Sequence, residues 1–269
     1  MTVFSPNLLW LIPVGLLTGG LGGMLGIGGS ILMIPAMMLL FGPDLHVYQG
    51  AAMIVNFFVV VPATLYHIRR GAVIPEIVRV TIPTAAATVL LGVWVSESAW
   101  FRGANEIHLS RLFGAFLWYE AGFNLWRAAA PMSRKAPEPE LSRPPAAWRV
   151  ATLVGLPTGF VGGLLGVGGG ILAVPTQQIF LRVPVRRAIA NSTATIICLS
   201  AIGAVFKNVT LVRQGMPPGR TLVLAVLLIP TAMIGGYLGA RLTHRMPLRF
   251  LRLCLVVLMA YAGWKLIAR

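Results

Sequence analysis

Long apolar stretches recur along the whole chain, and short breaks between them carry most of the charge. A helix needs about 20 apolar residues to cross the hydrocarbon core of a bilayer. The stretches lie at about 7–41, 50–68, 76–96, 108–128, 149–181, 188–206, 220–242 and 249–267. Six of them fit a single crossing each. The first and fifth are too long for one straight helix, which would rise roughly 50 Å at about 1.5 Å per residue.

The two long stretches are also the most similar pieces of the chain. Residues 19–35 read GGLGGMLGIGGSILMIP, and residues 159–175 read GFVGGLLGVGGGILAVP. The similarity continues further on, where Ile82-Pro83-Thr84-Ala85 recurs as Ile229-Pro230-Thr231-Ala232. The sequence therefore predicts two homologous membrane repeats, 1–130 and 148–269. A polar, proline-rich linker joins them at 131–147, which is typical of a solvated loop.

Each long stretch is centred on a glycine cluster that would weaken a helix, because an interior glycine costs about 1 kcal/mol relative to alanine. Non-helical backbone at membrane depth persists only where protein or a polar cavity satisfies it. We therefore interpret each cluster as the tip of a helix hairpin. Close helix packing through small residues is the alternative, since Gly19–Gly23 and Gly159–Gly163 have the GxxxG spacing. The two interpretations are compatible.

The distribution of Lys and Arg indicates the topology. If each long stretch enters and returns, the 22 basic residues divide fifteen to seven between the two sides, whereas single crossings give thirteen to nine. The positive-inside rule favours the first arrangement. Each half then has a glycine-rich hairpin plus three transmembrane helices, and the second half is inverted. We expect an all-α polytopic protein of the cell inner membrane, with a cytoplasmic linker and periplasmic termini. Such inverted repeats are common in secondary transporters.

Composition excludes several function classes. The chain is 57% hydrophobic and 11% charged, which is too apolar for a soluble protein. Its formal charge of +15 lies between apolar runs rather than on one polar face, so nucleic-acid binding is not expected. The sequence contains no P-loop, no cluster of metal ligands and no convergent nucleophile and base, so we expect no enzyme, no cofactor and no metal.

At its paired glycine motifs the chain resembles the sulfite exporter TauE/SafE family of membrane permeases. The resemblance covers essentially the whole chain: duplicated halves, a GGxxGxGG signature followed by proline, and a polar central loop. It implies transport of sulfite, a sulfonate or a related sulfur-containing or organic anion. The stretch Ala190-Asn191-Ser192-Thr193 is similar to what the family carries after the motif. The first half has Gly50-Ala51-Ala52-Met53 instead, which argues against a symmetric site.

An anion site needs donors with little desolvation cost, and amides at helix N-termini supply them. We expect the two glycine tips to present such amides at one site near the midplane. Side chains near the tips could add hydrogen bonds to the anion, or serve only as bonds between helices. The predicted substrate-binding residues are Gly26, Gly28, Gly29, Ser30, Gly166, Gly168, Gly169, Gly170, Asn56, Asn191, Ser192, Thr193 and Gln177.

Glu120 is the one acid predicted to lie deep in an apolar stretch, and such residues are expensive in a membrane. It is a candidate proton carrier for coupled transport; a structural pairing with Lys207 or His67 is the alternative. Besides a secondary transporter, the sequence leaves open an uncoupled anion channel or a membrane subunit of a larger complex. The expected partners are a small anion and the bilayer, and the GxxxG faces leave homodimerisation open.

Overall fold

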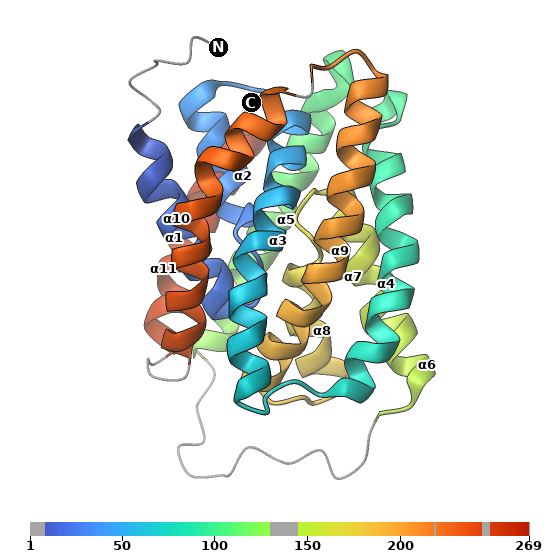
Figure 1. The fold of residues 1–269 in the computed structure, drawn as a ribbon, viewed down its shortest axis with the longest axis vertical. Coiled ribbons are helices and arrows are strands. Elements are labelled where there is room, and N and C mark those ends of the chain that lie inside the picture. The colour runs from blue at the N-terminus through green and yellow to red at the C-terminus, as the bar shows by residue number, and fades with distance from the viewer. Residues whose placement is uncertain (1–8, 130–144, 218, 244–247, 269) are drawn as a thin grey trace.

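The computed structural model describes residues 9–129, 145–217, 219–243 and 248–268, and within these ranges every regular element is helical (Figure 1). This confirms the predicted all-α class. The elements are α1 Leu11–Leu25, α2 Ser30–Phe41, α3 Leu45–Arg69, α4 Pro75–Ser96, η2 Ala99–Phe101, η3 Gly103–Asn105, α5 Glu106–Ala129, α6 Ala147–Val150, the π-helix η4 Ala151–Gly155, α7 Leu156–Leu164, α8 Gly170–Phe180, α9 Val185–Arg213, α10 Gly219–Thr243 and α11 Leu248–Ile267. Most of the predicted linker, 131–147, lies outside the described residues.

Four of the described helices, α3, α4, α9 and α10, are long and apolar enough to cross a membrane. Two of them extend beyond the stretches predicted from hydropathy. Helix α3 begins at Leu45 rather than near residue 50, and α9 runs to Arg213 rather than ending near 206. The added turns contain Gln49 and Lys207, which are fully buried. Hydropathy treats such side chains as water-exposed, so it predicted α3 to begin too late and α9 to end too early.

Both long apolar stretches are interrupted at their glycine clusters. In the first, α1 ends at Leu25 and α2 begins at Ser30; in the second, α7 ends at Leu164 and α8 begins at Gly170. Gly26 and Gly28 have φ angles of 66° and 77°, which L-residues with side chains rarely adopt. With 12 residues, α2 rises only about 18 Å, well short of a hydrocarbon core of about 30 Å.

The first helix of each half packs against a helix of the other half. Helix α1 lies along α10, and α7 lies along α4. The remaining contacts follow the same scheme, because α3 packs on α10, α9 packs on α4, and α5 packs on α11. Glycines permit these crossings: a Cβ on Gly23 would overlap the carbonyl oxygen of Gly236, and a Cβ on Gly163 that of Val89. The glycine stretches thus serve close packing as well as the helix break.

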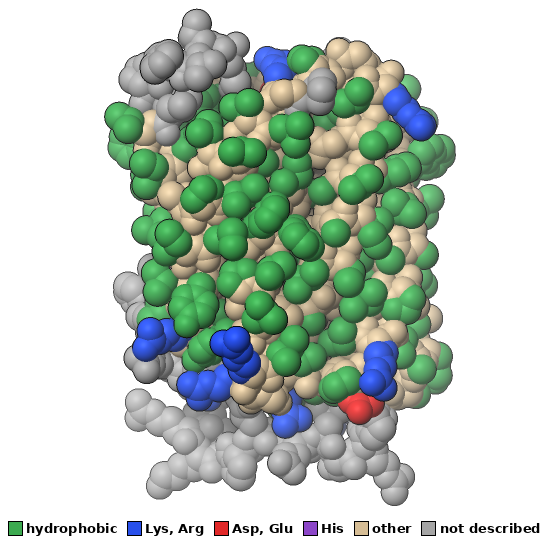
Figure 2. All heavy atoms as spheres, viewed as in Figure 1, with side chains coloured by type: hydrophobic (Ala, Val, Ile, Leu, Met, Phe, Trp, Pro, Cys, Tyr) green, Lys and Arg blue, Asp and Glu red, His purple; other side chains and the backbone are tan. Residues whose placement is uncertain are grey.

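The outer surface is apolar around the middle of the molecule. Figure 2 shows one face on which hydrophobic side chains cover the central zone, while Lys and Arg side chains lie toward the two ends. Leucine, valine and isoleucine side chains on several helices are more than half exposed, among them Leu17, Leu65, Val223 and Val226. Such a continuous apolar surface is far larger than soluble monomers expose, and it suits contact with lipid chains.

Replacing Gly163 by alanine is expected to destabilise the fold by about 1–3 kcal/mol, because the added methyl group overlaps the α4 backbone. Gly122→Ala is the matched control, since a Cβ there meets nothing within 4 Å, and alanine favours the helix by about 1 kcal/mol. Thermal unfolding of the purified proteins in detergent measures both changes. Equal melting temperatures for the two variants would contradict the close α4–α7 packing.

Candidate functional site

The two glycine tips meet at the side chain of Asn56, which is buried near the middle of α3. Asn56 Oδ1 accepts the backbone N–H of Ser30 at 3.1 Å, and its Nδ2 donates to Ser30 Oγ at 2.8 Å. The same Nδ2 lies 3.2 Å from the carbonyl oxygen of Val167 in the second tip. The Ser30 hydroxyl also donates to this carbonyl, at 3.2 Å. One amide side chain therefore connects both tips.

Glycine is required where the tips face Asn56. Gly28 and Gly168 have φ angles of 77° and 71°, so any other residue would be strained there. Space is limited as well: a Cβ on Gly28 would lie 3.1 Å from the Asn56 amide, and one on Gly168 would lie 3.2 Å from Asn56 Nδ2. The two glycines lie on either side of a single amide group.

A second contact joins the tips on the side of α9. The Ser192 hydroxyl donates to the Gly26 carbonyl oxygen at 2.5 Å and lies 3.3 Å from that of Gly170. A Cβ on Gly170 would come within 2.8 Å of the Gly26 oxygen, so the two backbones touch here. Of the predicted site residues, the structure brings together Gly26, Gly28, Ser30, Gly168, Gly170, Asn56 and Ser192.

The electrostatics of this region favour an anion. Helices α2 and α8 both start at the tips, so the positive ends of their dipoles converge there. Each begins after a glycine, so no N-cap side chain satisfies its first-turn amides. The surrounding tip residues are buried, which removes the screening by water.

The other predicted residues, all of them described by the structure, do not contact Asn56 or the Ser192 hydroxyl but face other neighbours. Gly29 and Gly169 pack against the first arms of their own hairpins, and Gly166 packs against Gln49. Thr193 donates to the Ala190 carbonyl of its own helix at 2.9 Å.

Gln177 and Asn191 form a separate pair. Asn191 Nδ2 donates to Gln177 Oε1 at 2.8 Å, and Asn191 Oδ1 accepts the Ile74 N–H at 2.7 Å. Gln177 is fully buried. These hydrogen bonds connect α8 and α9 to each other and to the segment before α4.

Glu120 lines a small cavity of about 30 Å³ beside the first tip. The cavity is bounded by Leu25, Ile27, Glu120, Phe123, Asn124, Ile171, Val174, Pro175, Gln178, Val185 and Ile189. Glu120 Oε2 lies 3.4 Å from Asn124 Nδ2, and Glu120 Oε1 has no hydrogen-bond partner within the described part of the chain. The same holds for Gln178 Oε1. This cavity has room for about one water molecule, which could bond to both oxygens.

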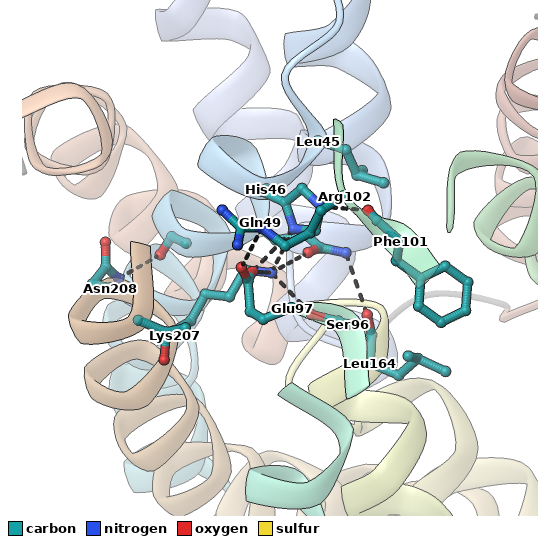
Figure 3. Close-up of polar contacts among 12 residues, drawn as sticks. Leu45, His46, Gln49, Ser96, Glu97, Phe101, Arg102, Leu164, Lys207 and Asn208 are labelled. Carbon is teal, nitrogen blue, oxygen red and sulfur yellow. Dashed lines mark hydrogen bonds and ion pairs between the residues drawn. The ribbon is translucent and has the colours of Figure 1, made fainter. Parts of the chain in front are cut away.

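Lys207 is not a partner of Glu120. It forms an ion pair with Glu97 instead (Figure 3). Lys207 lies close to the C-terminal end of α9, which in Figure 1 is at the same end of the molecule as the start of α1 and the end of α11. The hydropathy pattern did not indicate this pairing, because Glu97 directly follows the end of α4, where a solvent-exposed loop is expected. His67 is fully buried in α3.

The Lys207 cluster consists of polar side chains from α3, α4, α9 and the segment after α4 (Figure 3). Lys207 Nζ donates to Gln49 Oε1 at 2.7 Å and to Ser96 Oγ at 3.0 Å, and it lies 3.0 Å from His46 Nδ1. His46 Nδ1 also lies 3.0 Å from Glu97 Oε1. Sequence reasoning missed this cluster, except for naming Lys207 as a base.

The electrostatics of the cluster keep Glu97 ionised. Burial alone would raise the pKa of Glu97, but the hydrogen bond with His46 and the positive charge of Lys207 outweigh it and lower the pKa to about 2. Arg102 Nε lies 3.9 Å from Glu97 Oε2 and is partly exposed. The carboxylate is thus surrounded by three basic side chains.

Comparisons with known proteins identify the family. The family model "Sulfite exporter TauE/SafE" matches residues 11–266. The probable membrane transporter protein MamO of Paramagnetospirillum magneticum is 27% identical over 97% of this chain and 44% of its own length. The chain thus spans less than half of that relative.

Other relatives are matched over nearly their whole length. The probable membrane transporter proteins YunE of Bacillus subtilis and MJ0441 of Methanocaldococcus jannaschii are 26% and 27% identical, over 96% and 92% of their lengths. They align with 96% and 94% of this chain. No solved structure matches. The chain belongs to the TauE/SafE sulfite exporter family, a family of multi-pass membrane transporters and not of enzymes.

Proposed function

We propose that this protein is a secondary transporter that moves a small oxyanion across the inner membrane, with the anion bound between the two glycine tips. Sulfite, a sulfonate or a related sulfur-containing or organic anion is the proposed substrate class, as the family description suggests. The observation that carries the proposal is the convergence of two helix N-termini, from different halves of the chain, on Asn56. The first tip presents the Ser30 N–H there and the second presents the Val167 carbonyl oxygen, while the positive ends of the α2 and α8 dipoles both face this place.

The proposed topology is an inverted repeat with one hairpin entering from each side. The reciprocal packing of α1 on α10 and of α7 on α4 supports it, because a two-fold axis in the membrane plane would exchange these pairs. In Figure 1 the start of α1 and the end of α11 lie at the same end of the molecule. The fifteen-to-seven division of basic residues supports the proposed orientation, with a cytoplasmic linker and periplasmic termini.

The packed state of the tips favours a transporter over an open channel. Gly28, Gly168 and Asn56 are buried, and each tip contacts the other or α3 directly. An anion reaches this place only after the hairpins move relative to α3 and α9. Alternating displacement of two such hairpins about a central site is the usual scheme for transporters built from inverted repeats.

Glu120 is the proposed proton carrier. Its carboxyl group lines the cavity that also contacts Ile27 of the first tip and Ile171 of α8. A change in its protonation would alter the charge next to both hairpins, so proton uptake and anion movement would be coupled through the same packing contacts.

Anion binding at the tips is tested with Asn56→Asp and Asn56→Ala in purified protein. A ligand present at about 100 times its Kd adds about 2.7 kcal/mol to the folded state, which raises the melting temperature. We expect sulfite to stabilise the wild type and, more weakly, Asn56→Ala, and to have no effect on Asn56→Asp, whose carboxylate repels it. Both variants lose the hydrogen bonds that Asn56 Nδ2 donates to Ser30 Oγ and the Val167 carbonyl oxygen, while only Asn56→Asp keeps an acceptor for the Ser30 N–H and adds a negative charge.

Sulfate, thiosulfate, sulfoacetate, acetate and chloride complete the panel and define the substrate class. Stabilisation of Asn56→Asp by the same anion and to the same extent as the wild type would place the binding site elsewhere. Steady flux of several anions without saturation or dependence on a proton gradient would favour the uncoupled channel.

Replacing Glu120 by glutamine is expected to abolish acceleration of sulfite flux by a pH gradient across proteoliposomes, while exchange of sulfite for sulfite at equal pH continues. Glutamine preserves the shape and the bond with Asn124 but cannot release a proton. Gln178→Glu is not a suitable control because it adds charge to the same cavity, so Asn124→Ala, which only removes a neighbour, is used. An unchanged response to the gradient in Glu120→Gln would exclude it as the carrier.

A further inference from the structure

The Lys207 cluster has a composition that helix packing alone does not require. Lys207 and Glu97 are both buried, with side-chain exposures of 0% and 3%. Burying a charge pair usually brings no net stability over a well-packed apolar pair. Ionisable groups inside a membrane protein commonly lie on the path of an ion. The cluster therefore calls for an explanation beyond folding.

The donors of the cluster are arranged around one carboxylate. Lys207 Nζ forms an ion pair with Glu97 Oε1, and His46 Nδ1 lies 3.0 Å from the same oxygen. Glu97 Oε2 has no hydrogen bond within the described residues and only the more distant Arg102 Nε, at 3.9 Å. Two nitrogens close to one carboxylate oxygen, with Arg102 near the other, resemble the surroundings of a bound oxyanion, and the Glu97 carboxylate lies where such an anion would lie.

The cluster adjoins the second glycine tip through Gln49. Gln49 Oε1 accepts from Lys207, and Gln49 Nε2 donates to the Leu164 carbonyl oxygen at 3.4 Å. Gly166 packs directly on the Gln49 side chain. Asn56 follows seven residues after Gln49 on α3, which places it about 10 Å further along the same helix face. The carboxylate and the tip site thus lie in succession along α3.

Arg102 connects the cluster to the surface. Its side chain is 40% exposed, and it lies between η2 and η3, outside the apolar helices. Glu106 and Arg102 are the further charged groups whose fields reach Lys207, and Glu106 Oε1 also accepts the Leu45 N–H at 2.6 Å. An anion arriving from this end meets Arg102 first and the buried Lys207 next.

We propose that Lys207, His46 and Arg102 form a second binding station for a small oxyanion, at the end of the pathway nearest the termini, and that Glu97 is its resident counter-ion. While the station is empty, Glu97 neutralises Lys207. An entering oxyanion replaces the Glu97 carboxylate on the three bases, and loss of that contact frees the α4 end from α3 and α9. The inference rests on the proposed function for the direction of travel to Asn56, but not for the binding itself.

The test uses Glu97→Gln, Lys207→Met and the double variant, in full-length protein. Glu97→Gln removes the resident carboxylate at nearly constant shape, so sulfite should raise its melting temperature at concentrations about tenfold below those needed by the wild type. The double variant lacks both charges, which leaves no buried charge unpaired, so it should fold like the wild type and lose this gain. Sulfite flux in proteoliposomes should fall about tenfold or more in Lys207→Met and in the double variant.

The outcomes separate the station from the proposed function. Wild-type flux in the double variant would overturn the station and leave the transporter in place. A second outcome is that the wild-type protein transports no sulfite while Glu97→Gln binds sulfite only when Lys207 is present. In that case the proposed transport of sulfite is wrong and the second binding station stands. If the double variant does not fold, sulfite binding is measured instead in Lys207→Arg combined with Glu97→Gln. A retained charge should preserve binding in the Glu97→Gln background, and loss of binding there, in folded protein, would overturn the proposal.

Discussion

Buried backbone that is not helical must find hydrogen-bond partners inside the protein, and this requirement governs the centre of the molecule. Both glycine tips break their helices among buried residues, so their amides and carbonyls lack the bonds that a continuous helix would supply. Asn56 supplies part of the replacement, by accepting from Ser30 and donating toward Val167. Ser192 contributes on the other side through the Gly26 carbonyl. The tips are thus stabilised by α3 and α9 and by each other.

Glycine has two separate roles in this arrangement. At Gly28 and Gly168 it permits a positive φ and close approach to Asn56. At Gly23 and Gly163 it removes side chains where α1 and α7 cross α10 and α4. The first role forms the tip and the second holds its supporting arm against the other half. In a membrane, where apolar contact with lipid competes with contact between helices, such close packing is a major source of association.

Charged side chains lie in different surroundings beside the two glycine tips. Near the termini, Glu97 and Lys207 neutralise each other within a polar cluster that reaches the second tip through Gln49. Beside the first tip, Glu120 lines a small cavity. A buried pair resists opening because separation exposes two charges, whereas a single carboxyl group beside a cavity responds to a proton.

The sequence alone determined the helical class, the membrane setting, the duplicated halves and the positions of the helix breaks, because these depend on local composition and on glycine spacing. It also identified Asn56, Ser30 and Ser192 as polar residues in apolar surroundings. It did not show which tip residues meet, since Gly26 and Ser192 are separated by 166 residues and only packing brings them together. Nor did it reveal the partner of Lys207. Hydropathy assigns His46, Gln49 and Glu97 to water by type, and only the tertiary structure, by placing opposite charges and hydrogen-bonding groups beside them, made their burial favourable.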